Sequence, residues 1–108
     1  MHYFFVILDP QNRDKFRRNG GCEVLMTILT DKENSVGVKV HACDALAVAS
    51  TEDELAKEQF MDCNVAAELP KLLKENAEIE SMVISICNAF RSLVTADDNR
   101  LVVSKVFR

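Results

Sequence analysis

Along most of the chain, apolar residues recur every three or four positions, which is the spacing that places them on one side of an α-helix. The first such segment follows Asp9, an N-cap residue with a proline directly after it, and stops before Gly20. A second segment covers residues 22–29, and a polar connector at 31–35 separates it from a longer one at 36–49. We therefore predict two short helices followed by a long one.

The apolar pattern of this first half returns 44 residues later. In the long helix of the first half, the pattern forms a stripe of five residues. A shift of 44 residues aligns each of them with a residue of a second stripe. The first stripe is Val38, Ala42, Ala45, Leu46 and Ala49, and the second is Met82, Ile86, Ala89, Phe90 and Leu93. The same shift aligns Asp9 with Asp53, Phe16 with Phe60, Leu25 with Leu69, Leu29 with Leu73, Cys43 with Cys87, and Thr51 with Thr95. We expect the same side of the long helix to be buried in both copies.

Local signals mark the helices of the second copy. Thr51 and Glu54 have the spacing of a capping box, which predicts that a helix begins there. Asn64 takes the place of the turn glycine of the first copy, and asparagine is the next best residue for a left-handed backbone. Pro70 falls inside the expected second helix, where it would remove a backbone hydrogen bond and clash with the preceding turn. We therefore expect that helix to begin near Glu68 or to kink at the proline.

A three-helix unit of this length is typical of armadillo and HEAT repeats, which have about 40–47 residues. The fold class that we predict is an all-α solenoid of the armadillo or HEAT type. Residues 9–52 would form the first repeat and 53–96 the second, while 97–108 would begin a third. We expect residues 1–8 to be the end of a preceding helix or an irregular start. The alternative is an irregular bundle of six helices whose lengths merely alternate.

Four segments, residues 16–29, 36–50, 64–73 and 82–94, resemble the armadillo consensus of a short helix, a glycine turn and two longer helices. The matching positions are Phe16, Gly20, Leu25-Met26-Thr27-Ile28-Leu29 and Ala42-Cys43-Asp44-Ala45-Leu46. The stretch at 88–100 also looks like the junction between repeats in one branch of this family. The resemblance implies a right-handed superhelix whose third helices line a concave groove that holds extended peptides. It implies binding, not catalysis.

The peptide groove of armadillo proteins carries a ladder of tryptophan and asparagine on the third helices, and this chain departs from it. Asp44 and Asn88 stand at the tryptophan positions, and Val48 and Ser92 stand at the asparagine positions. Without asparagine side chains to hold a peptide backbone, we do not expect recognition of basic nuclear-import signals.

The predicted function is that of a non-catalytic scaffold that binds a protein or peptide partner of unknown identity along its third helices. The side chains that we expect to contact this partner lie one turn apart on equivalent helices. They are Asp44, Val48, Asn88, Arg91 and Ser92.

A different hypothesis is that the chain is a truncated segment of a longer repeat array and has no independent function. Residues 1–8 lack a polar cap, and the third copy of the pattern stops inside its first helix. Stable arrays usually need at least three repeats with capped ends. In this interpretation the exposed ends of the solenoid could also associate with each other.

Composition and charge fit a folded domain, because the 108 residues are 48% hydrophobic and 28% charged. The net charge of −4, with both signs interleaved, leaves no basic stripe for nucleic acid. One basic cluster, Arg13, Lys15, Arg17 and Arg18, could attract RNA or an acidic partner. It has no interleaved aromatic residues, so a solvated helix face is the better interpretation.

The four cysteines are spaced about twenty residues apart, without the close pairs of zinc sites or small disulfide scaffolds. We interpret them as buried thiols in a reducing compartment, the cytoplasm or the nucleus. The apolar run at residues 3–8 is far shorter than the roughly 20 residues that span a bilayer. Because no basic segment precedes this run and no small-residue cleavage site follows it, we expect neither a membrane anchor nor a signal peptide.

No constellation of residues predicts catalysis or cofactor binding. His2 and His41 are the only histidines, and neither has a serine or aspartate partner at a recognisable spacing. His41 and Cys43 are two residues apart, which on a helix points them in different directions and argues against a shared metal. The glycines at 20 and 21 lack the accompanying residues of a phosphate-binding loop. We therefore predict that the protein is not an enzyme and binds neither metal nor cofactor.

Overall fold

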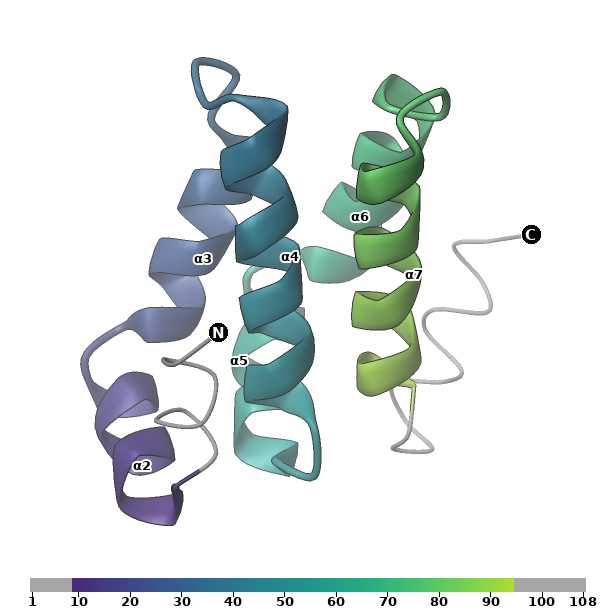
Figure 1. Ribbon diagram of the computed structural model, residues 1–108. Helices are drawn as coiled ribbons and strands as arrows, with labels where there is room; N and C mark the ends of the chain where they lie inside the picture. Colours follow the sequence, from purple (N-terminus) through teal and green to yellow (C-terminus); the bar gives the residue numbers. More distant parts are fainter. Residues whose placement is uncertain (1–8, 95–108) are drawn as a thin grey trace.

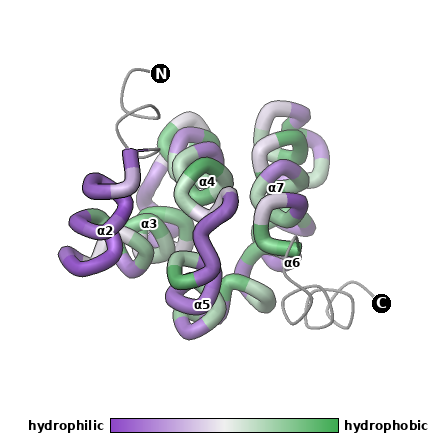
Figure 2. Tube along the Cα trace, turned by 90° about the horizontal axis from the view of Figure 1, so that it is seen from below, coloured by the Kyte–Doolittle hydropathy of each residue, from purple (hydrophilic) through white to green (hydrophobic). Residues whose placement is uncertain are grey.

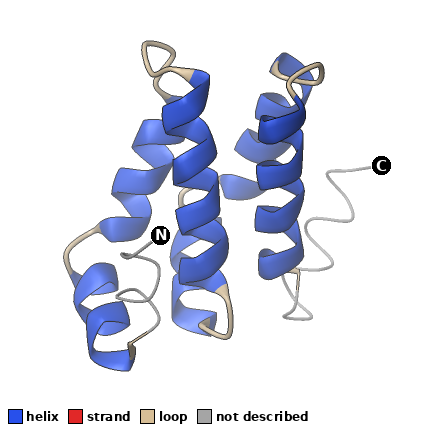
Figure 3. Cartoon of the chain, in the orientation of Figure 1, coloured by secondary structure: helices blue, strands red, loops and turns tan. Residues whose placement is uncertain are grey.

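The computed structural model describes residues 9–94, and within this range the chain forms six α-helices and no strand. The helices are α2 (Pro10–Arg18), α3 (Gly21–Thr30), α4 (Val36–Ser50), α5 (Glu54–Asp62), α6 (Val65–Glu75) and α7 (Glu80–Leu93) (Figures 1 and 3). The prediction of an all-α fold is confirmed. The expectations for residues 1–8 and for the third copy at 97–108 lie outside the described residues.

The helices fall into two sets of three, α2 to α4 and α5 to α7, which have closely similar lengths. The first set has helices of 9, 10 and 15 residues, and the second has helices of 9, 11 and 14 residues. Each helix of the second set begins 44 residues after its counterpart. For the first two helices of each set, the recurrence of the helix starts follows from local signals that the two halves of the sequence share.

The first helix of each set begins at an aspartate. The Asp9 side chain accepts a hydrogen bond from the backbone N–H of Gln11, and the Asp53 side chain accepts one from Ala56. The expected capping box at Thr51 is wrong. Thr51 instead ends α4, and its hydroxyl donates to the Ala47 carbonyl at 2.7 Å. A threonine hydroxyl can bond back to the preceding helix as readily as it caps the next one.

The second helix of each set follows a residue in the left-handed region of backbone space. Gly20 has φ of 77° and Asn64 has φ of 67°, so the asparagine takes the glycine's place as predicted. Gly21 is required for another reason. A Cβ atom at this position would lie 2.4 Å from ring atoms of Phe16, so the close approach of α2 and α3 leaves no room for a side chain.

Pro70 neither shortens α6 nor marks its start. The helix begins at Val65, and the proline is its sixth residue, so the expected start near Glu68 is wrong. An interior proline costs roughly 3 kcal/mol because it removes one backbone hydrogen bond and crowds the preceding turn. The apolar side of α6 offsets this cost by packing into the core, where Val65 and Leu69 are fully buried.

The two long helices, α4 and α7, lie side by side and run in the same direction, with α3 and α6 behind them (Figure 1). Viewed from below, α2 is mostly hydrophilic and lies at the edge, whereas α3 is mostly hydrophobic (Figure 2). The core runs through both sets of helices. Its buried side chains include Cys22, Met26, Leu29, Cys43, Leu46, Phe60, Val65, Leu69, Leu72, Met82, Ile86 and Leu93.

The predicted apolar stripe is buried in α7 but only partly in α4. All five of its positions in α7 are buried. In α4, Ala42, Leu46 and Ala49 are buried and Ala45 is half-buried, but Val38 is 45% exposed. The expectation that the same side is covered twice is therefore wrong at the first turn of α4. Both helices carry the stripe, so the difference in its burial depends on which other helices pack against it.

None of the helices between Asp9 and Val94 has the length and apolar character needed to cross a bilayer.

Replacing Leu46 by alanine should lower the free energy of unfolding by about 2–5 kcal/mol, because it leaves a cavity in the core beside α7. Urea denaturation followed by circular dichroism measures this loss. Leu55→Ala is the matched control, since Leu55 is 56% exposed and the same change should cost no more than about 0.5 kcal/mol. Equal effects of the two substitutions would contradict the described core.

Candidate interaction site

The predicted contact residues lie on the two neighbouring long helices. Asp44 and Val48 belong to α4, and Asn88, Arg91 and Ser92 belong to α7. Arg91 is exposed and the other four are half-buried. Because α4 and α7 are parallel and packed together, the five residues lie on two adjacent helices (Figure 1).

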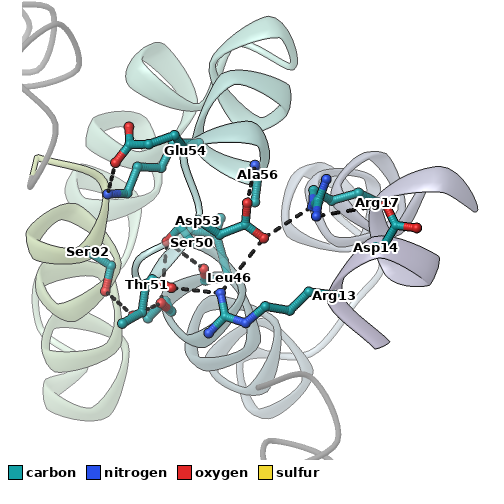
Figure 4. A network of polar contacts seen from close by, with 12 residues as sticks. Arg13, Asp14, Arg17, Leu46, Ser50, Thr51, Asp53, Glu54, Ala56 and Ser92 are labelled. Atoms are coloured by element: carbon teal, nitrogen blue, oxygen red, sulfur yellow. Dashed lines mark hydrogen bonds and ion pairs between the residues drawn. The ribbon is translucent and has the colours of Figure 1, made fainter. Parts of the chain in front are cut away.

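Three of these residues take part in hydrogen bonds. Arg91 donates from Nη2 to Asn88 Oδ1 at 2.6 Å, one turn away on the same helix. The Ser92 hydroxyl lies 3.4 Å from the hydroxyl of Thr51, which links the last turn of α7 to the end of α4 (Figure 4). The contact shows the register of the two helices, with Thr51 level with Ser92.

The sequence analysis missed a polar network centred on Asp53, in the connection between α4 and α5. The Asp53 side chain is only 9% exposed, and both of its oxygens are used. Oδ1 accepts from the Ala56 N–H at 3.2 Å, and Oδ2 accepts from Arg17 Nε at 3.1 Å (Figure 4). Arg13 Nη1 lies 3.8 Å from the same Oδ2. One carboxylate thus caps α5 and attaches it to α2.

Arg13 extends this network to the end of α4. Its Nη1 donates to the Thr51 carbonyl at 2.7 Å, and its side chain is 14% exposed. The two arginines of α2 therefore hold the point at which one set of helices passes into the next. Two signals in the sequence could have revealed this contact. The two arginines are four residues apart, which puts both on one side of a helix, and Asp53 aligns with the N-cap Asp9.

The network changes the interpretation of the basic cluster. Arg13 and Arg17 point into the junction, and Arg18 forms an exposed ion pair with Asp14 at 3.1 Å. Lys15 remains exposed on α2. The four charges do not form one open basic surface, so the structure offers little support for an RNA site at this helix.

The position that the shift of 44 residues aligns with Arg13 is Lys57, which is buried. Its side chain is 1% exposed, and Nζ lies 3.1 Å from Glu54 Oε1. Burial of an ammonium group is costly unless partners compensate for its lost hydration. The residues aligned with Thr51 and Asp53 are Thr95 and Asp97, which lie outside the described residues. The second set of helices thus carries a basic residue, Lys57, at the position where Arg13 of the first set contacts the junction.

The four cysteines are free, and they differ in exposure. Cys22 and Cys43 are buried, Cys63 is half-buried and Cys87 is exposed, so the prediction of four buried thiols is wrong for Cys87. Burial raises the pKa of the Cys22 thiol to about 12, and burial together with the nearby Asp44 does the same for Cys43. The pKa of Cys63 is also raised, chiefly by burial and then by Glu23.

Between Asp9 and Val94, no three histidine, cysteine or acidic side chains converge in a way that could hold a metal ion. His41 is exposed while Cys43 is buried, so the two do not face a common site.

Comparison of the chain with protein-family models, curated proteins and solved structures finds no match. The resemblance to armadillo repeats therefore depends on the sequence pattern alone.

Replacing Asp53 by alanine should lower the free energy of unfolding by about 2–3 kcal/mol, because it removes an N-cap and the 3.1 Å ion pair of the half-buried Arg17, which keeps only the 4.0 Å contact with Asp14. Denaturant titration measures the change. Asp62→Ala is the control, because Asp62 is exposed at the end of α5 and the same change there should cost no more than about 0.5 kcal/mol. A loss for Asp53→Ala no larger than that of the control would show that the network does not stabilise the fold.

Alkylation of the native protein at pH 8 should modify Cys87 first and leave Cys22 and Cys43 unmodified. A thiol with a pKa of about 12 is ionised in roughly one molecule in ten thousand at this pH, and burial also blocks the reagent. Peptide mass spectrometry after timed labelling measures the order of reaction. Labelling in denaturant is the control, in which all four thiols should react. Rapid native modification of Cys22 or Cys43 would contradict their burial.

Proposed function

We propose that the chain is an armadillo or HEAT-type α-solenoid segment that acts as a non-catalytic protein-interaction scaffold. Two features support the proposed repeat. The helix starts recur at a spacing of 44 residues, and the two long helices pack in parallel as neighbours. Stacked repeats of this kind present extended surfaces that bind other proteins.

The observation that carries the proposal is the parallel packing of α4 and α7, with accessible side chains on both helices. Arg91 is exposed, and Asp44, Val48 and Asn88 keep part of their surface in solvent. Val48 is not among the partly buried apolar residues that pack against the core. A partner lying across the two helices would meet one apolar side chain, a carboxylate and a guanidinium.

The chemistry of this face favours a protein or peptide that carries both charges. Asp44 can pair with a basic side chain, and Arg91 can pair with a carboxylate, while Val48 supplies apolar contact. Asn88 already accepts a hydrogen bond from Arg91, so it is not positioned as a free clamp for a peptide backbone. We therefore infer recognition through side chains rather than through the amide ladder of the peptide-binding armadillo groove.

Two other proposals are weaker on the same observations. Binding of RNA or an acidic partner through Arg13 to Arg18 would compete with the contacts that Arg13 and Arg17 make at the junction. Catalysis would need a nucleophile or an acid–base pair in a cleft, and we propose none. The free thiols of Cys22 and Cys43 fit a reducing compartment, for which we propose the cytoplasm or the nucleus.

The proposal is tested by selecting peptides from a displayed library on the purified chain and measuring their affinity by fluorescence polarisation. Val48→Glu and Arg91→Glu should each weaken binding of the selected peptides by about tenfold or more, with the melting temperature unchanged. Leu55→Glu on α5 is the control, because it adds the same charge at an exposed site outside this face. Selected peptides that bind both variants as tightly as the unsubstituted chain would refute the assignment of the face.

A further inference from the structure

At the outer side of the first set of helices lies an open, almost entirely apolar hollow, which we call the N-face. Its lining residues come from α3 and α4: Leu25, Ile28, Val38, His41 and Ala42. Val38 is 45% exposed, and Leu25 and Ile28 are half-buried. Apolar side chains gathered at one surface are a common mark of an interaction site.

The second set of helices shows what normally happens at these positions. The residues found 44 positions later are all buried, with at most 4% of their surface exposed: Leu69, Leu72, Met82, Ser85 and Ile86. Met82, Ser85 and Ile86 belong to α7, the helix that packs against α4, and Leu72 of α6 shares a small hollow with Leu29 of α3. The N-face is therefore the side of the first set that corresponds to the buried side of the second set. In the second set, this side is covered by the first set.

The opposite side shows the complementary difference. In the first set, Leu29 and Cys43 are fully buried, and Leu29 lines a hollow together with Leu72 of the second set. Their counterparts Leu73 and Cys87 are half-buried and exposed, and the neighbouring Ile84 is 51% exposed. We call Leu73, Ile84 and Cys87 the C-face. Within residues 9–94, the chain thus carries both halves of its own internal contact on opposite sides, each with side chains that are partly exposed.

We propose that a second copy of this chain stacks on the N-face through its C-face, continuing the α4–α7 contact from one molecule to the next. The internal contact shows how the residues at the corresponding positions pack together, and Leu25, Leu73 and Cys87 are identical to their counterparts. Because the two faces differ, the association is head to tail, and each added molecule presents a new free end.

Charge at the edge of the two faces agrees with this arrangement. Within the chain, Thr51 of α4 lies level with Ser92 of α7, which sets Ala47 near the level of Asn88 one turn earlier. Carrying this register 44 residues onward places Arg91 of one molecule opposite Asp44 of the next. The pairing of opposite charges would favour this register over alternatives. It also places Cys87 near His41, inside the stacked contact.

The test measures how the mass of the protein in solution depends on its concentration, by sedimentation velocity under reducing conditions. The mass of the unsubstituted chain should rise with concentration and pass that of a dimer. Val38→Glu destroys the N-face and Cys87→Glu destroys the C-face, and both sites are exposed, so each variant should stay folded and monomeric. Leu55→Glu, with the same added charge on α5, should assemble like the unsubstituted chain.

A mixture of the two face variants gives the sharpest result. Each retains one intact face, so Val38→Glu and Cys87→Glu should form a one-to-one dimer that does not grow. Alkylation of the unsubstituted chain supplies a second measurement, since Cys87 should react more slowly as the protein concentration rises, whereas in Val38→Glu its rate should stay constant.

Three outcomes would overturn the proposal. The first is a monomer at every concentration. The second is dimerisation of Cys87→Glu by itself, with no mixed dimer of the two variants, which would indicate that two N-faces meet. The third is assembly that occurs only after deletion of residues 1–8 and that Val38→Glu abolishes. That result would show the apolar run at residues 3–8 to be what covers the N-face, in place of a second copy.

Discussion

The structure depends on the packing of α4 against α7. Each set of three helices has an apolar side that it cannot bury alone, and the two sets meet through these long helices. The five-residue stripe of α7 is fully buried as a result, whereas the same stripe of α4 keeps Val38 in solvent. A chain of this size buries only about two-thirds of its unfolded surface, so one such contact decides much of its stability.

A polar contact fixes how the two sets follow one another. Asp53 begins α5, and its carboxylate holds two arginines of α2 (Figure 4). Arg13 extends this contact to the end of α4 through the Thr51 carbonyl. Apolar packing is not directional and would tolerate small rotations of one set on the other. Hydrogen bonds from Arg13 and Arg17 restrict those rotations, because guanidinium groups and carboxylates bond in defined geometries.

The sequence predicted the features that local chemistry controls and missed those that a neighbour controls. The N-cap at Asp9 and the left-handed turns at Gly20 and Asn64 depend on nearby residues, and all three were correctly assigned. Pro70 was misread because the packing of α6 outweighs a local cost. The positions in the candidate site could be assigned to α4 and α7 from periodicity, but their exposure could not, because it depends on which side another set of helices covers.

The proposed partner face and the proposed stacking contact act together through the geometry of α7. A second copy on the C-face would place its α4 beside α7 of the first molecule. The contact would correspond to the one between α4 and α7 within a single chain. Asp44 and Val48 of one molecule would then continue the row of Asn88 and Arg91 of its neighbour. A partner long enough to span the row would make several weak contacts at once. Its apparent affinity for the stacked molecules would exceed its affinity for a single molecule. Stacking would therefore convert a small face with few strong contacts into an extended one.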